Sequence, residues 1–301
     1  MRKFFMHLNA TEVTTIAIGG FDGIHRGHQQ LIKRLGENGA LLVIDKDEAN
    51  LTPGLKRSEY SKYPCMFYHF SKLKDLDGRE FIALLYKLFP KLEKIIVGYD
   101  FRFGANRAHD AKDLNKLFPG SVQIIQEFIF DGISVHSSNI REFIKAGNMI
   151  QANRLLGREY AITGSVIQGQ GLGKKSLYPT LNLHVKNFLL PKEGVYATRT
   201  LANGKVFESV SFMGIRESTD GGFAVETHLL DVGLEDAPLQ VELFFVQFLR
   251  ENRKFKNLEL LKNQITQDIQ SAKDILRTCK VYFDNKLEGD YVYLASPPKA
   301  G

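Results

Sequence analysis

The fold of the first half of the chain is decided by the stretch Ile16-Ala-Ile-Gly-Gly-Phe-Asp-Gly-Ile-His-Arg-Gly-His28. The β-branched and apolar residues over 14–18 predict a buried strand, and the spacing of apolar residues over 29–35 predicts a helix directly after the glycines. A strand that runs through glycines into a helix is a favourable phosphate site. Glycines let the backbone approach the ligand, and the helix start presents unpaired N–H groups.

This turn also carries the residue types that a nucleotide site needs. His25 and His28 are three apart, so both imidazoles can face the site from the first helical turn. Imidazoles can donate hydrogen bonds to a polyphosphate while charge moves onto it, so we expect both to be catalytic. The predicted nucleotide-binding residues of the turn are Gly20, Phe21, Asp22 and Gly23. The alternative interpretation is a plain strand-to-helix turn with two surface histidines.

The turn matches one known signature better than others. No Gly-Lys-Ser/Thr follows it, which excludes the P-loop pattern. The run from Gly20 to His28 resembles the His-x-Gly-His signature of the nucleotidyltransferase superfamily. Its Phe-Asp-Gly form is similar to the FMN adenylyltransferase module of bacterial bifunctional riboflavin kinase/FAD synthetases.

Length and charge set the broad class of the protein. A chain of 301 residues is long enough for two domains. Lys and Arg number 40 against 34 Asp and Glu, an excess that suits anionic small substrates and gives little support to nucleic-acid binding. No membrane-spanning run, signal peptide or metal-type cysteine spacing is visible, so we expect a cytoplasmic protein without a membrane partner. The oligomeric state stays open.

The first half of the chain is expected to form a parallel α/β sheet of the Rossmann-like kind. Strands are predicted over 41–45, 92–97 and 122–128, with a helix over 81–89 and a loop over 46–66. Asn139 with Glu142 resembles a capping box and predicts a helix start there. Around that start Ser137, Ser138 and Arg141 are candidate anion ligands, although a well-capped helix alone would explain them.

The pattern changes after about residue 160, where helices give way to short β-rich runs. These runs lie at 160–167, 196–201, 207–213, 224–231 and 239–248, which predicts a small antiparallel β-barrel or sandwich. Apolar residues at spacings of three and four over 258–276 predict a terminal helix packed on it. We therefore expect two domains, 1–158 and 159–301.

A second group of candidate residues follows the boundary. Alternate glycines and a lysine suit a phosphate-covering flap, or equally a hairpin turn: Gly169, Gly171, Gly173 and Lys174. Thr180 and Asn182 are two apart, so their oxygens can face one side of a strand and help hold Mg²⁺ beside nucleotide phosphates. Glu226 could accept a proton from an attacking alcohol, although an outward-facing strand carboxylate is the simpler interpretation.

Together these stretches resemble the riboflavin kinase module of the same bifunctional family. The matching motifs are Pro179-Thr-x-Asn182, Leu190-Pro-x-x-Gly-Val-Tyr-Ala197, Glu226-x-His-Leu-Leu-Asp231 and Phe255-x-x-Leu258. In the first half, Val97-Gly-Tyr-Asp-Phe-Arg-Phe-Gly104, Arg107 and Ser137-Ser-x-Ile-Arg141 also match. The resemblance therefore covers nearly the whole chain, with the motifs in the family's order.

The resemblance implies two activities, with riboflavin, FMN, FAD and ATP as the ligands. The N-terminal module would transfer AMP from ATP to FMN, giving FAD and pyrophosphate. The C-terminal six-stranded barrel would phosphorylate riboflavin with ATP and Mg²⁺. By the same resemblance His25, His28, Ser138 and Arg141 would handle ATP phosphates, and Glu226 would be the base for the ribityl hydroxyl. Flavin contacts are implied for Asp100, Phe101 and Arg107.

Several positions depart from the family pattern. Gly20 stands where Asn is common, and Ile44-Asp45 continues into Lys46-Asp-Glu instead of a Phe-Asp-Pro-His-Pro motif. In the second half, Phe212-Met-Gly-Ile-Arg-Glu-Ser218 replaces the usual Asn-Ile-Gly-Thr-Arg-Pro-Thr. The sequence therefore leaves two alternatives to a bifunctional enzyme: a single-activity enzyme with one degenerate module, and a non-catalytic nucleotide- or RNA-binding protein.

Overall fold

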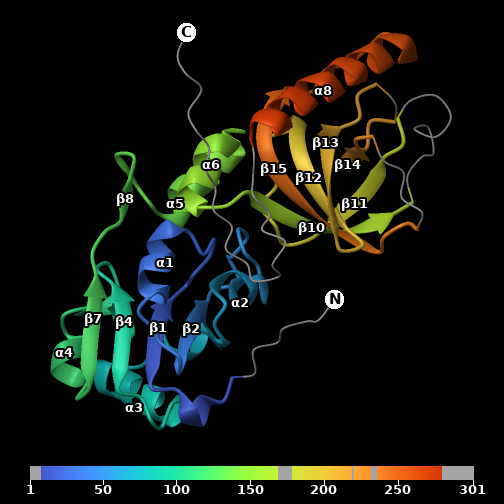
Figure 1. Ribbon diagram of the computed structural model, residues 1–301. Helices are drawn as coiled ribbons and strands as arrows, with labels where there is room; N and C mark the ends of the chain where they lie inside the picture. Colours follow the sequence, from blue (N-terminus) through green and yellow to red (C-terminus); the bar gives the residue numbers. More distant parts are fainter. Residues whose placement is uncertain (1–7, 169–177, 219, 232–235, 280–301) are drawn as a thin grey trace. The chain divides into compact units, whose positions relative to one another are not determined.

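The chain folds into two compact units, Met1–Asn139 and Ile140–Gly301. The computed structural model describes residues 8–168, 178–218, 220–231 and 236–279 (Figure 1). The expected boundary at 158/159 falls inside the second unit, because helix α6 (Met149–Leu156) is built into the barrel. The buried side chain of Asn153 accepts a hydrogen bond from Tyr160 N and donates one to Phe245 O, each at 2.8 Å.

The first unit contains a five-stranded parallel sheet in the order β3-β2-β1-β4-β7, which confirms the expected α/β class. The strands are β1 (Thr15–Gly19), β2 (Gly39–Asp45), β3 (Cys65–His69), β4 (Lys94–Gly98) and β7 (Ser121–Ile125). From the central β1 the chain builds outward on one side through β2 and β3, and on the other through β4 and β7. The order reverses beside β1, where open α/β sheets bind their ligands at the carboxyl ends of the strands.

Helices cover both faces of this sheet. Ile16 and Ile18 face the core closed by α3 (Gly78–Leu88) and α4 (Leu114–Leu117). Ala17 faces the opposite core with α1 (Arg26–Ile32). Because side chains alternate along a strand, a run that is apolar at every position is what a sheet covered on both faces requires.

The loop predicted over 46–66 was wrong. It contains helix α2 (Lys56–Ser61) and leads into the edge strand β3. The helix has only six residues and ends at Lys62, whose φ of 60° is left-handed. The side chains of β3 are mostly half buried, so no clear apolar alternation marks it. Short elements of this kind carry little periodic signal.

The predicted capping box at Asn139 was also wrong. Helix α5 (Ser137–Lys145) already includes Asn139, whose Nδ2 donates to Ser134 O at 2.9 Å. The capping box lies instead at the start of α3, between Asp77 and Glu80. The remaining short elements of the first unit are η1 (Ala10–Glu12), η2 (Phe70–Lys72), η3 (Ala105–Arg107), β5 (Arg102–Phe103), β6 (His109–Asp110), β8 (Ile129–Phe130) and β9 (Ile133–Ser134).

The second unit is a closed six-stranded antiparallel barrel in the order β10-β11-β14-β13-β12-β15, which confirms the expected small β-barrel. Its strands are β10 (Tyr160–Ile167), β11 (Leu181–Val185), β12 (Gly194–Ala202), β13 (Lys205–Ile215), β14 (Phe223–Leu229) and β15 (Gln240–Arg250). Helix α8 (Leu258–Thr278) lies against β12, β13 and β15 (Figure 1). No helix among the described residues is long and apolar enough to cross a membrane.

The barrel strands carry two different faces. One holds a buried network of hydroxyls that satisfy one another: Thr198, Thr200, Ser209, Ser211 and Thr227. The other, which faces away from the barrel interior, is apolar through Val195, Ala197, Val210 and Val246 and packs against Ala272 and Leu276 of α8. An ion pair fixes the helix, with Arg250 Nε and Nη2 each 2.8 Å from an Asp268 carboxylate oxygen. This apolar face, which is the outer face of the barrel, and α8 can therefore enclose a pocket between them.

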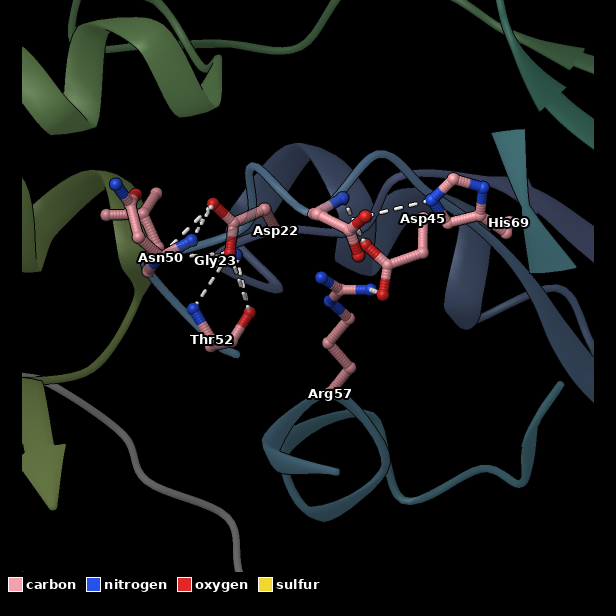
Figure 2. Close-up of polar contacts among 9 residues, drawn as sticks. Asp22, Gly23, Asp45, Asn50, Thr52, Arg57 and His69 are labelled. Carbon is pink, nitrogen blue, oxygen red and sulfur yellow. Dashed lines mark hydrogen bonds and ion pairs between the residues drawn. The ribbon is translucent and has the colours of Figure 1, made fainter. Parts of the chain in front are cut away.

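A buried cation in the first unit gives a test of the packing. Arg57 is 1% exposed, lies over the Phe67 ring, and has Nη1 3.5 Å from Asp45 Oδ2 (Figure 2). We expect Asp45→Asn to lower the free energy of unfolding by about 2 kcal/mol or more, because the buried charge loses its counter-ion. Arg57→Met should lose less than half as much, since it removes the charge and keeps an apolar stem. Urea unfolding measures both, and a larger loss for Arg57→Met would contradict this account.

Candidate active sites

The glycine-rich turn after β1 has an unusual backbone. Phe21, Gly23 and Ile24 all have positive φ, of 52°, 94° and 40°. The two non-glycine side chains are each 1% exposed, so burial holds the backbone in this conformation. Positive φ at bulky residues costs on the order of 1–3 kcal/mol each, and such strain is concentrated at functional sites. The turn is therefore a shaped, preformed element.

The carboxylate of Asp22 fixes this turn to the segment 50–52. Its Oδ1 accepts from Thr52 N at 2.8 Å and from Leu51 N at 3.1 Å, and its Oδ2 accepts from Asn50 N at 3.1 Å (Figure 2). Gly23 N donates to Thr52 Oγ1 at 2.7 Å. The sequence predicted Asp22 to bind nucleotide; in the structure its side chain positions the backbone of two loops.

The two histidines lie together at the start of α1, as expected. His25 is the N-cap, and its Nδ1 accepts from His28 N at 3.2 Å. The two rings are stacked, with centroids 3.6 Å apart. A neutral His25 whose Nδ1 accepts carries its proton on Nε2. A side chain at Gly27 would be crowded, because a Cβ would lie 3.0 Å from Val135 O and 3.1 Å from His25 Nδ1.

The start of α5 is joined to the same turn. Ser137 Oγ donates to Asp22 O at 2.7 Å. The structure thus brings Ser137, and Ser138 next to it in the chain, to the turn that holds Gly20, Phe21, Gly23 and the histidines. Arg141 lies one helical turn further along α5 and falls in the second unit.

The three residues predicted to bind flavin are less clearly assembled. Asp100 is exposed just after the carboxyl end of β4, where a ligand is expected. The Phe101 ring packs between Phe81 and Phe103, at centroid distances of 6.4 and 5.9 Å. Arg107 is exposed on η3, and no hydrogen bond, ion pair or ring contact among the described residues joins it to Asp100 or Phe101.

In the second unit, three predicted residues line one pocket. Thr180, Asn182 and Glu226 border a cavity of about 180 Å³ between the outer barrel face and α8. Asn182 and Glu226 face each other as register partners of β11 and β14. Apolar residues line much of the rest: Val195, Val210, Phe212, Phe255, Leu261, Ile265 and Ile269. The pocket joins an apolar region to a polar edge, as a heteroaromatic ligand with a polar tail requires.

Polar contacts hold the rim of this pocket in place. His228 Nδ1 is 2.8 Å from Pro179 O, which fixes the segment leading into Thr180. Tyr178 OH is 3.0 Å from Thr266 Oγ1 on α8. Arg216 Nη1 lies 3.1 Å from Glu226 Oε1. The predicted flap residues Gly169, Gly171, Gly173 and Lys174 lie outside the described residues.

The donors in the pocket suit one kind of cation. Within the part of the chain that the structure describes, no group of three or more His, Cys, Asp or Glu could hold a metal ion. Thr180 and Asn182 offer neutral hard oxygens, which suit Mg²⁺ when nucleotide phosphates supply the negative charge. The residues therefore fit a metal that arrives with a nucleotide.

Several pocket residues were not predicted from the sequence. Arg216, Tyr178, His228 and Arg250 all line the cavity. Arg216 lies within Phe212-Met-Gly-Ile-Arg-Glu-Ser218, the stretch that departs from the family pattern. That departure was the sequence feature that could have drawn attention to it. His228 lies within the matching motif Glu226-x-His-Leu-Leu-Asp231 and Tyr178 directly precedes Pro179-Thr-x-Asn182, so those motifs were the available signal. Arg250 could not be found, because its place depends on how α8 packs on the barrel.

The two units, each with its own candidate site, match one class of protein, a transferase with two modules. A riboflavin kinase family model matches residues 156–276, and a FAD synthetase family model matches residues 7–43. The bifunctional riboflavin kinase/FMN adenylyltransferase of Buchnera aphidicola is 32% identical over 294 residues, covering 87% of this chain and 92% of that protein. The Pseudomonas fluorescens protein of the same description is 30% identical, covering 85% and 91%.

The chain therefore belongs to the family of bifunctional riboflavin kinase/FMN adenylyltransferases. A crystal structure described as a macrolide-efflux protein from Streptococcus pneumoniae has the same fold, with a TM-score of 0.78. It is 23% identical and covers 87% of this chain and 94% of its own, so it supports the architecture alone.

The role of Asp22 can be tested by unfolding. Asp22→Asn replaces one acceptor oxygen by an NH₂ group that faces backbone donors, so we expect the free energy of unfolding to fall by about 2–3 kcal/mol. Asp47→Asn is the matched control, because that side chain is 79% exposed and its loss should cost about 0.5 kcal/mol at most. Equal losses of unfolding free energy for the two changes in urea titrations would show that the Asp22 hydrogen bonds to residues 50–52 do not stabilise the fold.

Proposed function

We propose that this protein converts riboflavin to FAD in two ATP-dependent steps, one in each unit. The observation that carries the kinase half is the pairing of β11 with β14, which places Glu226 opposite Asn182 in a pocket with Thr180. The adenylyl-transfer half is supported by the two stacked histidines at the preformed turn after β1. Riboflavin, FMN, FAD and ATP are the proposed ligands.

In the proposed kinase site, Glu226 is the base for the ribityl hydroxyl. The hydroxyl oxygen attacks the terminal phosphorus of ATP, its proton passes to the Glu226 carboxylate, and the bond to ADP breaks. The flavin ring system would occupy the apolar part of the pocket, under α8 and beside Phe212. Mg²⁺ would neutralise phosphate charge, held by Thr180 and Asn182 together with the nucleotide.

In the proposed adenylyltransferase site, positioning matters more than proton removal. The phosphate of FMN is already an anionic nucleophile, so it can attack the α-phosphorus of ATP without a base. Pyrophosphate leaves with the developing charge, and donors from His25 and His28 stabilise it. Ser137 and Ser138 would bind the same phosphates, with Arg141 further along the helix and flavin near Asp100.

One departure from the family pattern, Gly20, is not required by the fold. A Cβ at Gly20 would meet only Ile44 O, at 4.0 Å, so the turn has room for a side chain there. Glycine at this position therefore relieves no strain in the fold. Its lack of a side chain changes the contacts that the turn can offer to a ligand. The second departure begins at the end of β2. There Asp45 pairs with Arg57 and accepts a hydrogen bond from Asp47 N.

A first variant separates the two activities. We expect His28→Ala to lower FAD formation from FMN roughly a hundredfold or more, the usual loss for one donor to a developing anion. FMN formation from riboflavin should persist, because the kinase pocket is built from the second unit. Both rates can be measured by chromatography on one preparation, and an equal loss of both in a folded variant would contradict the two-site proposal.

A second variant tests the base. Glu226→Gln keeps the size of the side chain and removes most of its basicity. FMN formation should fall roughly a hundredfold or more, with ATP affinity nearly unchanged and FAD formation from supplied FMN retained. Phosphorylation at the parent rate would return Glu226 to the role of an ordinary strand carboxylate.

A further inference from the structure

A chain of charged side chains reaches Glu226 from the β13–β14 connection. Arg216 Nη1 is 3.1 Å from Glu226 Oε1, and Arg216 Nη2 is 2.9 Å from Asp220 Oδ2. The Arg216 and Glu226 side chains are each 21% exposed, so this pair is partly shielded from solvent. Among the described residues, Arg216 is the only cation that forms an ion pair with Glu226.

The arginine is itself held by the backbone of the connection. Arg216 N donates to Gly222 O at 2.9 Å, and Gly221 N donates to Arg216 O at 3.1 Å. Asp220 Oδ1 accepts from Gly222 N at 3.2 Å. That hydrogen bond, followed by the nearby Arg216 charge, lowers the pKa of Asp220, so the anchor is anionic at neutral pH. Asp220 therefore presents a fixed negative charge to the guanidinium.

The other arginines of the pocket are engaged elsewhere. Arg250 forms a bidentate ion pair with Asp268 of α8. Arg253 donates to Gln264 of the same helix and lies over the Phe255 ring. These contacts hold α8 on the barrel, whereas Arg216 contacts the side chain that would take the proton.

We propose that Arg216, anchored by Asp220, is a positioning residue that orients Glu226 for proton abstraction in the riboflavin kinase reaction. This inference rests on the proposed role of Glu226. A glutamate side chain has three rotatable bonds, and a charge-assisted hydrogen bond to one oxygen selects among its rotamers. With Oε1 held by Arg216, Oε2 is left to receive the hydroxyl proton. The bond to phosphorus then forms as the bond to ADP breaks.

The arrangement follows the general rule for activated nucleophiles, in which a base is oriented by a third group. Misplacement of a catalytic group by about 1 Å can cost roughly a hundredfold in rate. Loss of Arg216 should therefore reduce kcat and leave the KM values for ATP and riboflavin nearly unchanged, because Arg216 is assigned no substrate contact.

The first test uses Arg216→Gln and Arg216→Lys. We expect Arg216→Gln to lower kcat of riboflavin phosphorylation roughly ten- to a hundredfold, with partial recovery in Arg216→Lys. Arg277→Gln is the matched control, because Arg277 is an exposed ion-pairing arginine of α8 outside the pocket. Urea titration of each variant, followed by far-UV circular dichroism, reports that its barrel is folded, and FAD formation from supplied FMN reports only on the first unit.

A double-mutant cycle distinguishes positioning from direct contact with the phosphates. If Arg216 acts through Glu226, the variant with both Arg216→Gln and Glu226→Gln should be no slower than Glu226→Gln alone. A further tenfold loss in the double variant would overturn the proposal, since Arg216 would then act on the substrates. A parent-like kcat in Arg216→Gln would overturn it as well.

Gly222 provides a second probe that changes no charge. A Cβ at Gly222 would lie 3.2 Å from Arg216 Nη2, so in Gly222→Ala the guanidinium must shift by a small amount, and kcat should fall less than in Arg216→Gln. A larger loss of kcat than in Arg216→Gln would count against the proposal. Failure of the proposed function has a different signature: a parent protein that makes no FMN, or a Glu226→Gln variant that keeps the parent rate. Either result would remove the basis of this inference too.

Discussion

The kinase pocket depends on how the barrel is closed. Among the described residues, strand β11 joins β14 through two residue pairs, Leu181 with Thr227 and Asn182 with Glu226. The second pair places the proposed metal ligand opposite the proposed base, so one register both closes the barrel and assembles the site. Because a one-residue shift would turn every side chain of a strand to the other face, the site exists only in this register.

In the first unit, the proposed site depends on a strained turn after β1. Three positive φ values after β1 bring the backbone into a conformation that the buried side chains of Phe21 and Ile24 hold in place. The Asp22 carboxylate and Ser137 then join that turn to two distant segments. The two proposed sites thus differ in structure, as their two proposed reactions differ in what they need. The first would position an anionic nucleophile and its leaving group, and the second would remove a proton from an alcohol.

The sequence predicted the elements with strong periodicity and missed those fixed by tertiary contacts. The parallel sheet and the terminal helix have clear apolar patterns, the barrel was expected from five short β-rich runs, and all three were confirmed. Strand β11 was not among those runs. Helix α2 and the edge strand β3 were missed because they are short and half buried. Among candidate residues, Thr180, Asn182 and Glu226 were expected together and line one pocket. Arg216 was not singled out, because its importance arises from a contact with Glu226 that no local pattern encodes.

The most direct test of the central claim is the course of the reaction of the whole protein with riboflavin, ATP and Mg²⁺, with all products resolved. The account predicts that FMN accumulates first and FAD follows. ADP should equal the sum of FMN and FAD formed, and pyrophosphate should equal the FAD. Hydrolysis of ATP without flavin nucleotides, or FAD formed with no FMN and no ADP, would contradict it.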